Sequence, residues 1–152
     1  MDEKELDRVL GAALRTDDQF LSWMFAKSNL PEQGWRRVLI RDDWPWGAPK
    51  GDQKKFRETD VLVVCEDIHG NRLALHIENK GIQRPFDPDQ ASDYPRRARA
   101  WVGVEKWGNY SQWKCVLIAP RDYTKRYPVD CSHFDVHVSY EEVAEQLPLF
   151  KV

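Results

Sequence analysis

The segment TDVLVVCEDIHGNRLALHIENKG, residues 59–81, carries charged residues at the outer ends of two apolar runs. Asp60 stands at the start of the first run, and Glu78 and Lys80 stand at the end of the second. Two apolar runs with a turn between them predict a β-hairpin, in which the start of the first strand lies opposite the end of the second. We therefore expect the two carboxylates and the lysine to meet at the open end of that hairpin.

These three residue types are suited to hydrolysing a phosphodiester. Side chains alternate along a strand, so Glu78 and Lys80 share one face and Asn79 points to the other. Two neighbouring carboxylates repel each other, and Mg²⁺ or Mn²⁺ would relieve the repulsion with Asp60, Glu78 and the backbone carbonyl of Ile77 as its ligands. The lysine could then orient or deprotonate a water molecule. The plainer interpretation is a set of solvated strand-end charges in which Lys80 pairs with Glu78.

A second polar pair follows the hairpin on an expected helix. Gln90 and Tyr94 are four residues apart, so they share a helix face and are expected to point toward the open end of the hairpin. Asp89 is the predicted N-cap of this helix, and Pro95 is expected in its first turn, where a missing amide costs least. Taken alone, the pair is also compatible with ordinary polar positions at a helix N-terminus.

The order of Asp60 and then Glu78-Asn79-Lys80 resembles the D…(D/E)-x-K signature of the PD-(D/E)XK nuclease superfamily. Thr59 stands where that signature has proline. The resemblance implies a restriction-endonuclease-like fold with an α-β-β-β-α-β core. It also implies that Asp60 and Glu78 bind Mg²⁺ and that Lys80 is catalytic, in agreement with the chemistry expected from the residues themselves.

The resemblance extends to the helix after the hairpin. Gln90-x-x-x-Tyr94 resembles the Q-x-x-x-Y element of the RecB-type branch, which implies accessory roles for both residues near the metal site. Members of the superfamily often add an acid from the N-terminal helix. Asp17 and Glu5 are candidates for that role, Glu58 competes with them, and the sequence does not choose among the three.

The rest of the chain predicts the elements that must position these residues. Helices are expected over residues 3–15, from Thr16 to about residue 27, from residue 89 onward and from Ser139 to about Gln146, and strands are expected within 34–44 and over 59–65, 72–79, 113–120 and 133–140. This order predicts a single α/β domain spanning residues 1–152, with a mixed central sheet flanked by helices. The continuous apolar run of 113–120 is typical of a strand that is buried on both faces.

Two sequence patterns predict capping boxes at helix starts. Thr16 is followed three residues later by Gln19, and Ser139 is followed three residues later by Glu142. In such a box the first side chain accepts a backbone amide of the helix, and the second side chain accepts the amide of the first residue. Elsewhere, the Pro- and Gly-containing stretch WPWGAPKGDQKK, residues 44–55, predicts a loop that could contact a substrate or a partner.

Charge is polarised along the sequence. The formal net charge is −2, which argues against binding nucleic acid by bulk positive charge. Residues 81–126 nevertheless hold nine bases and five acids, an excess of four positive charges, whereas the first 20 residues hold six acids and three bases. Arg96, Arg97 and Arg99 follow the expected site and are predicted to contact phosphates. A solvated helix face with salt bridges is the competing interpretation.

Cysteine content and hydropathy indicate the compartment. Cys65, Cys115 and Cys131 are well separated and show no metal-type pairing with histidine, so reduced thiols in a cytoplasmic protein are expected. The acidic N-terminus MDEKELDRVL does not resemble a signal peptide, and no apolar run approaches the roughly 20 residues of a membrane span. Among the histidines, His76 lies two residues before Glu78 and therefore shares its face.

These observations predict a metal-dependent nuclease that hydrolyses phosphodiester bonds of nucleic acid, with DNA favoured over RNA. A chain of 152 residues leaves little room for a separate specificity domain, so sequence choice would come from loops, a homodimer or a partner protein. The alternative from another class is a non-catalytic or partner-dependent module that binds nucleic acid or protein on the same fold. Added metal distinguishes the two, because a nuclease should gain thermal stability from Mg²⁺ or Mn²⁺.

Overall fold

The computed structural model describes residues 2–42, 59–80 and 85–150. Its helices are α1 (Glu3–Thr16), α2 (Asp18–Lys27), α3 (Gln90–Ala100), the short 3-10 helix η2 (Glu105–Trp107), α4 (Tyr123–Arg126), α5 (Pro128–Cys131) and α6 (Tyr140–Gln146). Its strands are β1 (Arg36–Arg41), β2 (Val61–Glu66), β3 (Arg72–Asn79), β4 (Gln112–Ala119) and β5 (Val136–Ser139). The loop predicted over 44–55 and the candidate acid Glu58 lie outside the described residues. No helix in the described part of the chain is long and apolar enough to span a membrane.

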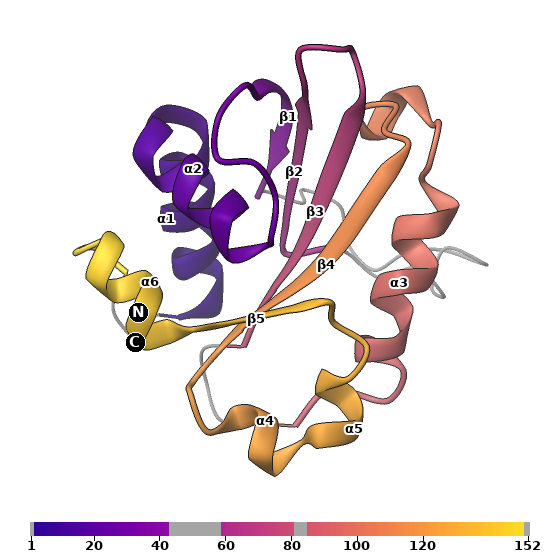
Figure 1. Ribbon diagram of the computed structural model, residues 1–152. Coiled ribbons are helices and arrows are strands. Elements are labelled where there is room, and N and C mark those ends of the chain that lie inside the picture. The colour runs from indigo at the N-terminus through magenta and orange to yellow at the C-terminus, as the bar shows by residue number, and fades with distance from the viewer. Residues whose placement is uncertain (1, 43–58, 81–84, 151–152) are drawn as a thin grey trace.

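Within the described residues, the strands form one mixed sheet with the order β1-β2-β3-β4-β5. β1, β2 and β3 pair antiparallel, while β3, β4 and β5 pair parallel. The parallel pairing of β3 with β4 requires a crossover connection, and α3 lies in that connection. The predicted α/β class, with a mixed sheet flanked by helices, is therefore confirmed (Figure 1).

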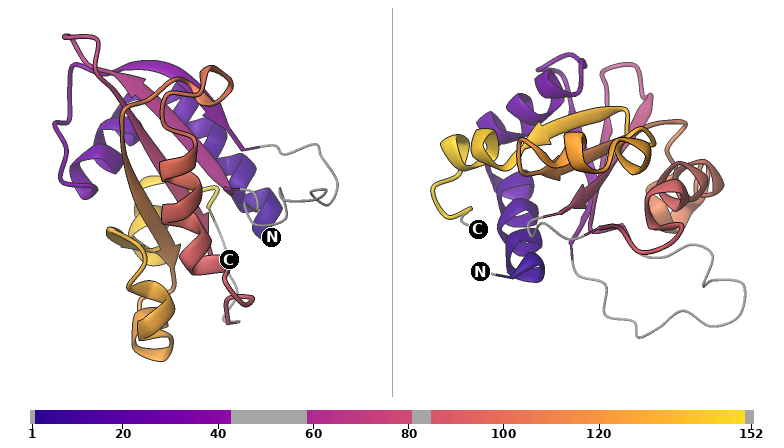
Figure 2. Two further views of the ribbon diagram at one scale, coloured as in Figure 1. Left: turned by 90° about the vertical axis from the view of Figure 1, so that its right-hand side faces the viewer. Right: turned by 90° about the horizontal axis from the view of Figure 1, so that it is seen from below.

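Helices cover both faces of this sheet. Figure 1 shows α1, α2 and α6 on one side and α3 on the other, and the turned views in Figure 2 agree. β4 shows why both faces are covered, because its apolar side chains alternate between the two. Val116 and Ile118 pack with α1, α2 and α6, whereas Leu117 and Ala119 pack with α3, α4 and α5. The prediction that this strand is buried on both faces is therefore confirmed.

β2 and β3 form the predicted hairpin, with a continuous register from the pair Val61 and Ile77 to the pair Glu66 and Arg72. Gly70 in the turn has a φ of +84°, a conformation that a residue without a Cβ adopts at low cost. The apolar runs and the turn residues together therefore place the two strands as the sequence predicts.

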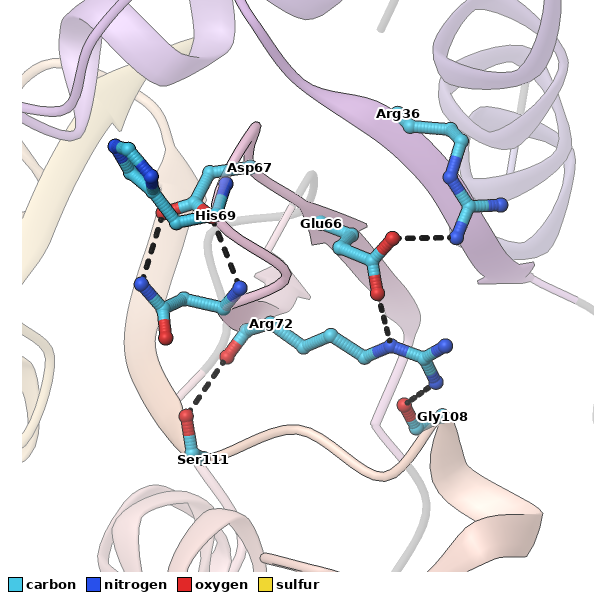
Figure 3. A network of polar contacts seen from close by, with 8 residues as sticks. Arg36, Glu66, Asp67, His69, Arg72, Gly108 and Ser111 are labelled. Atoms are coloured by element: carbon cyan, nitrogen blue, oxygen red, sulfur yellow. Dashed lines mark hydrogen bonds and ion pairs between the residues drawn. The ribbon is translucent and has the colours of Figure 1, made fainter.

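Figure 3 shows a polar network around the turn of this hairpin. Arg36 and Arg72 donate to the two carboxylate oxygens of Glu66, at 2.6 Å and 3.0 Å. Arg72 also donates to the carbonyl of Gly108 at 2.9 Å, and Asp67 accepts two backbone amides of the turn at 2.9 Å. The hydrogen bonds from the two arginines hold the pKa of Glu66 below its ordinary value. The network fixes the register of β1, β2 and β3 at the end of the hairpin away from the predicted site.

The start of α2 differs from the prediction. Thr16 is the last residue of α1, where its hydroxyl donates to the carbonyl of Ala12 at 2.8 Å. Asp17 is the N-cap of α2 and accepts the backbone amide of Phe20 at 3.0 Å. The predicted capping box of Thr16 with Gln19 is therefore wrong. A carboxylate next to the threonine takes its place, because a charged acceptor also interacts favourably with the positive end of the helix dipole.

The later helix starts agree with the predictions in position. Ser139 and Glu142 form both hydrogen bonds of the predicted capping box at α6. Asp89 is the N-cap of α3, as predicted, but its φ is +65° and its side chain makes no capping hydrogen bond. Pro95 is the sixth residue of α3 and thus lies in the second turn, one turn later than predicted.

The three cysteines are buried and free of disulfides. Cys65 and Cys115 lie in β2 and β4, as the apolar runs predict, and Cys131 is the last residue of α5. Burial raises the pKa of the Cys65 thiol to about 11, which disfavours the reactive thiolate at neutral pH.

Candidate active site

The hairpin register brings Asp60 and Glu78 opposite each other. β2 and β3 pair Val61 with Ile77, and Asp60 and Glu78 are the next residues outward. The backbone amide of Asn79 donates a hydrogen bond of 2.8 Å to Oδ2 of Asp60. The main chain of β3 therefore holds the Asp60 carboxylate at the open end of the hairpin, where the sequence predicts that the two acids meet.

Gln90, the first residue of α3, connects an acid and the lysine of the site. Its Nε2 donates to Oε1 of Glu78 at 3.1 Å, and its Oε1 accepts from Nζ of Lys80 at 3.2 Å. Oε1 also accepts the backbone amide of Asp87 at 3.0 Å, which fixes the orientation of the amide group. Glu78 and Lys80 thus share the sheet face covered by α3, as predicted, while Asn79 points to the opposite face and bonds to α1.

Tyr94, one helical turn after Gln90, holds the hairpin from the same side. Its hydroxyl accepts the backbone amide of Asp60 at 3.1 Å and donates to the carbonyl of Ile77 at 3.3 Å. Through Gln90 and Tyr94, α3 therefore contacts the start of β2 and the end of β3. The Ile77 carbonyl, a predicted metal ligand, already accepts this hydrogen bond and also faces Val61 in the β2–β3 ladder.

The acid and the lysine that Gln90 connects are almost fully buried. Glu78 is 3% exposed and Lys80 is 1% exposed. Burial raises the pKa of Glu78 well above its ordinary value, and the charge of Asp60 raises it further. A hydrogen bond from Tyr94 and the charge of Lys80 oppose this rise without cancelling it. Negative charge on Glu78 is therefore unfavourable unless a further cation is bound.

Asp7 in α1 is a third buried acid near this end of the hairpin. Its Oδ1 accepts from Nδ2 of Asn79 at 2.9 Å. Burial raises the pKa of Asp7 to about 9, and the charge of Asp60 contributes to the rise. Asp17 is instead the N-cap of α2, and Glu5 accepts a backbone amide in the N-terminal cap of α1. Asp7, which the sequence patterns did not single out, is therefore the acid that the N-terminal helix brings toward the site.

The sequence does contain a signal for the burial of Asp7. It lies three residues before Leu10 and seven before Leu14, so it belongs to the apolar face of α1. An acid at that spacing is buried by the same packing that buries the leucines. Its closeness to Asp60 could not be inferred in this way, because that depends on where α1 crosses the sheet.

The three arginines predicted to contact nucleic acid lie on α3 but do not share one surface. Arg96 and Arg99 are exposed, and Nη1 of Arg96 lies 3.8 Å from Oδ1 of Asp93. Arg97 is completely buried, and its Nε donates to the hydroxyl of Thr59. Residues three apart share a helix face and the two residues between them do not, which explains the difference. Arg96 and Arg99 are therefore the two that can reach a phosphate at the surface in this conformation.

His76 shares the face of Glu78, as predicted, but its ring nitrogens contact the hydroxyls of Thr59 and Tyr110 and not the acids. Its Nδ1 lies 2.9 Å from Oγ1 of Thr59, and its Nε2 lies 3.0 Å from the hydroxyl of Tyr110. Burial lowers the pKa of His76 well below its ordinary value, and the charge of Arg97 lowers it further. The ring is therefore neutral near pH 7, and both of its nitrogens have partners within the protein.

The donor set at the open end of the hairpin fits Mg²⁺ or Mn²⁺ in type. Asp60 and Glu78 supply carboxylate oxygens and Ile77 supplies a carbonyl oxygen, which are ligands that hard cations prefer. The repulsion that raises the pKa of Glu78 is what a divalent cation would relieve. The described residues contain no group of three or more His, Cys, Asp or Glu side chains that could hold a metal ion. An ion here would therefore depend on two carboxylates, a carbonyl and water.

Comparisons with protein-family models, with curated proteins and with solved structures found no significant match to the chain. The functional conclusion therefore depends on the residues and the geometry described above.

Proposed function

We propose that this protein is a metal-dependent nuclease with the restriction-endonuclease-like fold, acting on phosphodiester bonds of nucleic acid. The observation that carries the proposal is the hydrogen-bonded set at the open end of the hairpin, in which Gln90 bonds to Glu78 and Lys80 at once. Asp60 lies opposite Glu78, and Tyr94 holds its backbone amide. Residue types suited to phosphodiester hydrolysis thus converge there from two strands and one helix.

The arrangement of the elements supports the finer assignment of the fold. The N-terminal helices precede three antiparallel strands, which are followed by α3 and by β4 parallel to β3. This is the α-β-β-β-α-β order that the sequence resemblance implies. The acids lie at the ends of adjacent strands, and the Gln and Tyr residues lie on the crossover helix.

Asp60, Glu78 and the carbonyl of Ile77 would hold the ion, which supplies positive charge to the phosphate and lowers the pKa of a water molecule. In the proposed hydrolysis a water oxygen forms a bond to phosphorus in line with the ester bond that breaks. The attacking water loses a proton, and the departing oxygen receives one. The two carboxylates must be ionised for this role, although burial favours the protonated form of Glu78.

We propose that Lys80 orients or deprotonates the attacking water molecule. Its Nζ is held by Oε1 of Gln90 and lies 4.9 Å from the centroid of the Phe86 ring. An ammonium group has three N–H donors, so the group can donate to a water molecule as well as to Gln90. Because the same amide group bonds to Glu78, Gln90 fixes the lysine and the acid relative to each other.

Arg96 and Arg99 are the residues proposed to contact the phosphates of the polymer. Both are exposed on α3, the helix that also carries Gln90 and Tyr94. Phosphate contacts from arginine fix the position of a nucleic acid without reading its sequence. DNA is favoured over RNA as the substrate, and any sequence preference would come from loops, a second copy or a partner protein.

The test is a cleavage assay with single- and double-stranded DNA and RNA, in Mg²⁺, in Mn²⁺ and in chelator. Lys80→Ala is the test variant, and Lys27→Ala is the matched control because Lys27 lies on α2 and pairs with Glu142. We expect metal-dependent cleavage that Lys80→Ala lowers by about 10²- to 10⁴-fold and Lys27→Ala retains. No cleavage of any substrate by the wild-type protein would remove the proposal of a nuclease that acts alone and would favour the binding module or a partner-dependent enzyme.

One observation favours a non-catalytic or partner-dependent binding module as the second candidate. Glu78 and Lys80 are buried and bonded to Gln90, so their polar atoms are not open to a polymer in this conformation. A partner protein that displaces α3 would then be needed to expose them. In that case the protein binds nucleic acid without cutting it, and cleavage begins only when the partner is added.

A further inference from the structure

Arg97 is a charged side chain buried beneath α3 with most of its hydrogen-bonding capacity unused. It is 0% exposed, and within the described part of the chain its Nη1 and Nη2 have no hydrogen-bond partner. A buried guanidinium with unsatisfied donors destabilises the folded state relative to an apolar side chain of similar size. Its presence at this position is therefore not explained by stability.

Arg97 contacts two residues that adjoin Asp60, one through the sequence and one through a hydrogen bond. Its Nε donates to Oγ1 of Thr59 at 2.7 Å, and Thr59 directly precedes Asp60 in the chain. Its guanidinium carbon lies 4.3 Å from the centroid of the Tyr94 ring. The hydroxyl of that tyrosine accepts the backbone amide of Asp60 at 3.1 Å. One guanidinium thus contacts the residue that precedes Asp60 and the residue that bonds to its backbone amide.

Thr59 also belongs to a chain of hydrogen bonds whose direction the end groups determine. Arg97 can only donate, so the hydroxyl of Thr59 accepts from it and donates to Nδ1 of the neutral His76. Nε2 of His76 then donates to the hydroxyl of Tyr110, which donates to the carbonyl of Ala98. This series of hydrogen bonds begins and ends on α3 and passes through Thr59, which precedes β2, and His76 of β3. It therefore ties the position of Thr59 to that of the helix.

We propose that Arg97 is a positioning residue, which holds Asp60 through Thr59 on one side and through Tyr94 on the other. Its role in cleavage rests on the proposed nuclease function, whereas its role in holding the Asp60 segment does not. Stacking against the guanidinium keeps the tyrosine ring in place, which is a cation–π contact that gains strength when both groups are desolvated. Arg97 acts through these neighbours and does not contact the substrate.

The test is Arg97→Met, which removes the charge and the Nε donor but keeps a long apolar side chain. Amide hydrogen exchange is measured by NMR, without metal and without substrate. The amide of Asp60 should exchange at least about 10-fold faster than in the wild type, because its hydrogen bond to Tyr94 opens more often. The amide of Val116 in the core of β4 should keep its protection. Arg37→Met is the matched control, since Arg37 also has a buried, unpartnered Nη2 within the described residues but lies on β1.

Thermal denaturation and kinetics separate positioning from general stability. We expect an unchanged or higher Tm for Arg97→Met, because a buried unpaired charge has been removed. If the protein is a nuclease, kcat should fall about 10-fold or more with KM unchanged, and Arg97→Lys should restore part of it.

Three outcomes would test the positioning role of Arg97. Unchanged exchange at Asp60 overturns the positioning role, whatever the cleavage assay shows. Equal loss of protection at Asp60 and Val116 also overturns it, because Arg97 would then stabilise the whole domain. Faster exchange at Asp60 alone, in a protein that cuts no substrate, upholds the positioning role and overturns the proposal of a nuclease that acts alone.

Discussion

The backbone amide of Asn79 donates a hydrogen bond of 2.8 Å to Oδ2 of Asp60 across the open end of the hairpin. The side chain of Asn79 points to the other face of the sheet, where it donates to Asp7 and accepts from the hydroxyl of Tyr140. One residue between Glu78 and Lys80 therefore links the Asp60 carboxylate to α1 and α6. The middle position of the E-x-K sequence, which has no assigned chemistry, is thus a structural junction of the site.

The buried Asp7 should make stability fall as pH rises. Its pKa is about 9 in the folded chain and near 3.8 when exposed, so the folded state binds the extra proton between these values. Stability from this group is complete below about pH 4 and is lost as pH rises toward 9. Asp7→Asn should therefore raise the free energy of unfolding at pH 8 by at least about 1.4 kcal/mol, the equivalent of one pKa unit, with a smaller effect at pH 5. Urea denaturation in chelator at both pH values measures this.

The control for that measurement is Glu32→Gln, because Glu32 is an acid on the surface. It should leave the pH dependence of the unfolding free energy unchanged. Parallel stability curves for the wild type and Asp7→Asn across pH 5 to 8 would show that Asp7 does not hold its proton in the folded state.

Mn²⁺ or Mg²⁺ should stabilise the protein through Asp60 and Glu78. At a cation concentration 100 times the dissociation constant, the gain in unfolding free energy is about 2.7 kcal/mol. The gain should increase from pH 6.5 to pH 8, because Glu78 must lose its proton before it can bind the ion. Thermal denaturation with and without metal measures the gain. Asp60→Asn and Glu78→Gln should abolish it, and Glu66→Gln at the other end of β2 should retain it. Loss in all three variants would place the ion elsewhere.

Gln90 should be required for activity through both ends of its amide group. Gln90→Leu leaves Nζ of Lys80 and Oε1 of Glu78 without these hydrogen bonds, so we expect kcat to fall by about 10²-fold. The buried groups left without partners should also lower the unfolding free energy by about 1–3 kcal/mol. Gln90→Glu keeps an acceptor for the lysine but places a carboxylate against Glu78. Steady-state kinetics and urea denaturation of both variants measure the effects, and wild-type kcat in Gln90→Leu would contradict the assigned role.

Arg96 and Arg99 should contribute to binding in a way that depends on salt. An arginine that pairs with one phosphate of a single strand contributes about 0.7 to the slope of log binding constant against log salt, so its removal should lower the slope by that amount. Fluorescence anisotropy with labelled single-stranded DNA in chelator measures the slope for Arg96→Ala and Arg99→Ala. Arg36→Ala is the control, since Arg36 is an exposed arginine at the far end of the hairpin. Equal slopes for all the variants and the wild type would place the polymer on another surface.

Gly11 in α1 should not tolerate a methyl group. An ideal Cβ at this position would lie 2.0 Å from Oδ2 and 2.7 Å from Cβ of Asp42, whose carboxylate is paired with Arg15. Gly→Ala in an exposed helix interior gains about 1 kcal/mol, but here we expect Gly11→Ala to lose about 1–3 kcal/mol of unfolding free energy. Chemical denaturation measures the loss. The double variant with Asp42→Gly, which also removes the Cβ of residue 42, should recover stability relative to Gly11→Ala. A stabilising Gly11→Ala would show that Asp42 moves aside without cost.

Local sequence patterns were sufficient where the deciding contacts are close in the chain. The hairpin follows from alternating apolar residues and the Gly70 turn, and the capping box of Ser139 with Glu142 involves residues three apart. The prediction at Thr16 failed because the adjacent Asp17 is a stronger cap, a choice between two local signals that differ little in free energy.

Local patterns did not predict the environment of residues that helix packing places near the site. Asp7 was not named because its closeness to Asp60 depends on how α1 crosses the sheet. Arg97 was grouped with Arg96 and Arg99 by composition, although the packing of α3 buries it. In both cases the free energy of packing many apolar side chains decides the environment of one charged group.

The sequence by itself determined that Asp60 lies opposite Glu78 and that Lys80 shares the face of Glu78, because strand alternation and an antiparallel register follow from local backbone geometry. Its Q-x-x-x-Y spacing likewise determined that Gln90 and Tyr94 share a face of α3. The sequence also predicted that this face points toward the open end of the hairpin, but only the packing of α3 decided which groups Gln90 and Tyr94 bond there. That packing depends on contacts between residues far apart in the chain, whose energies no short segment contains.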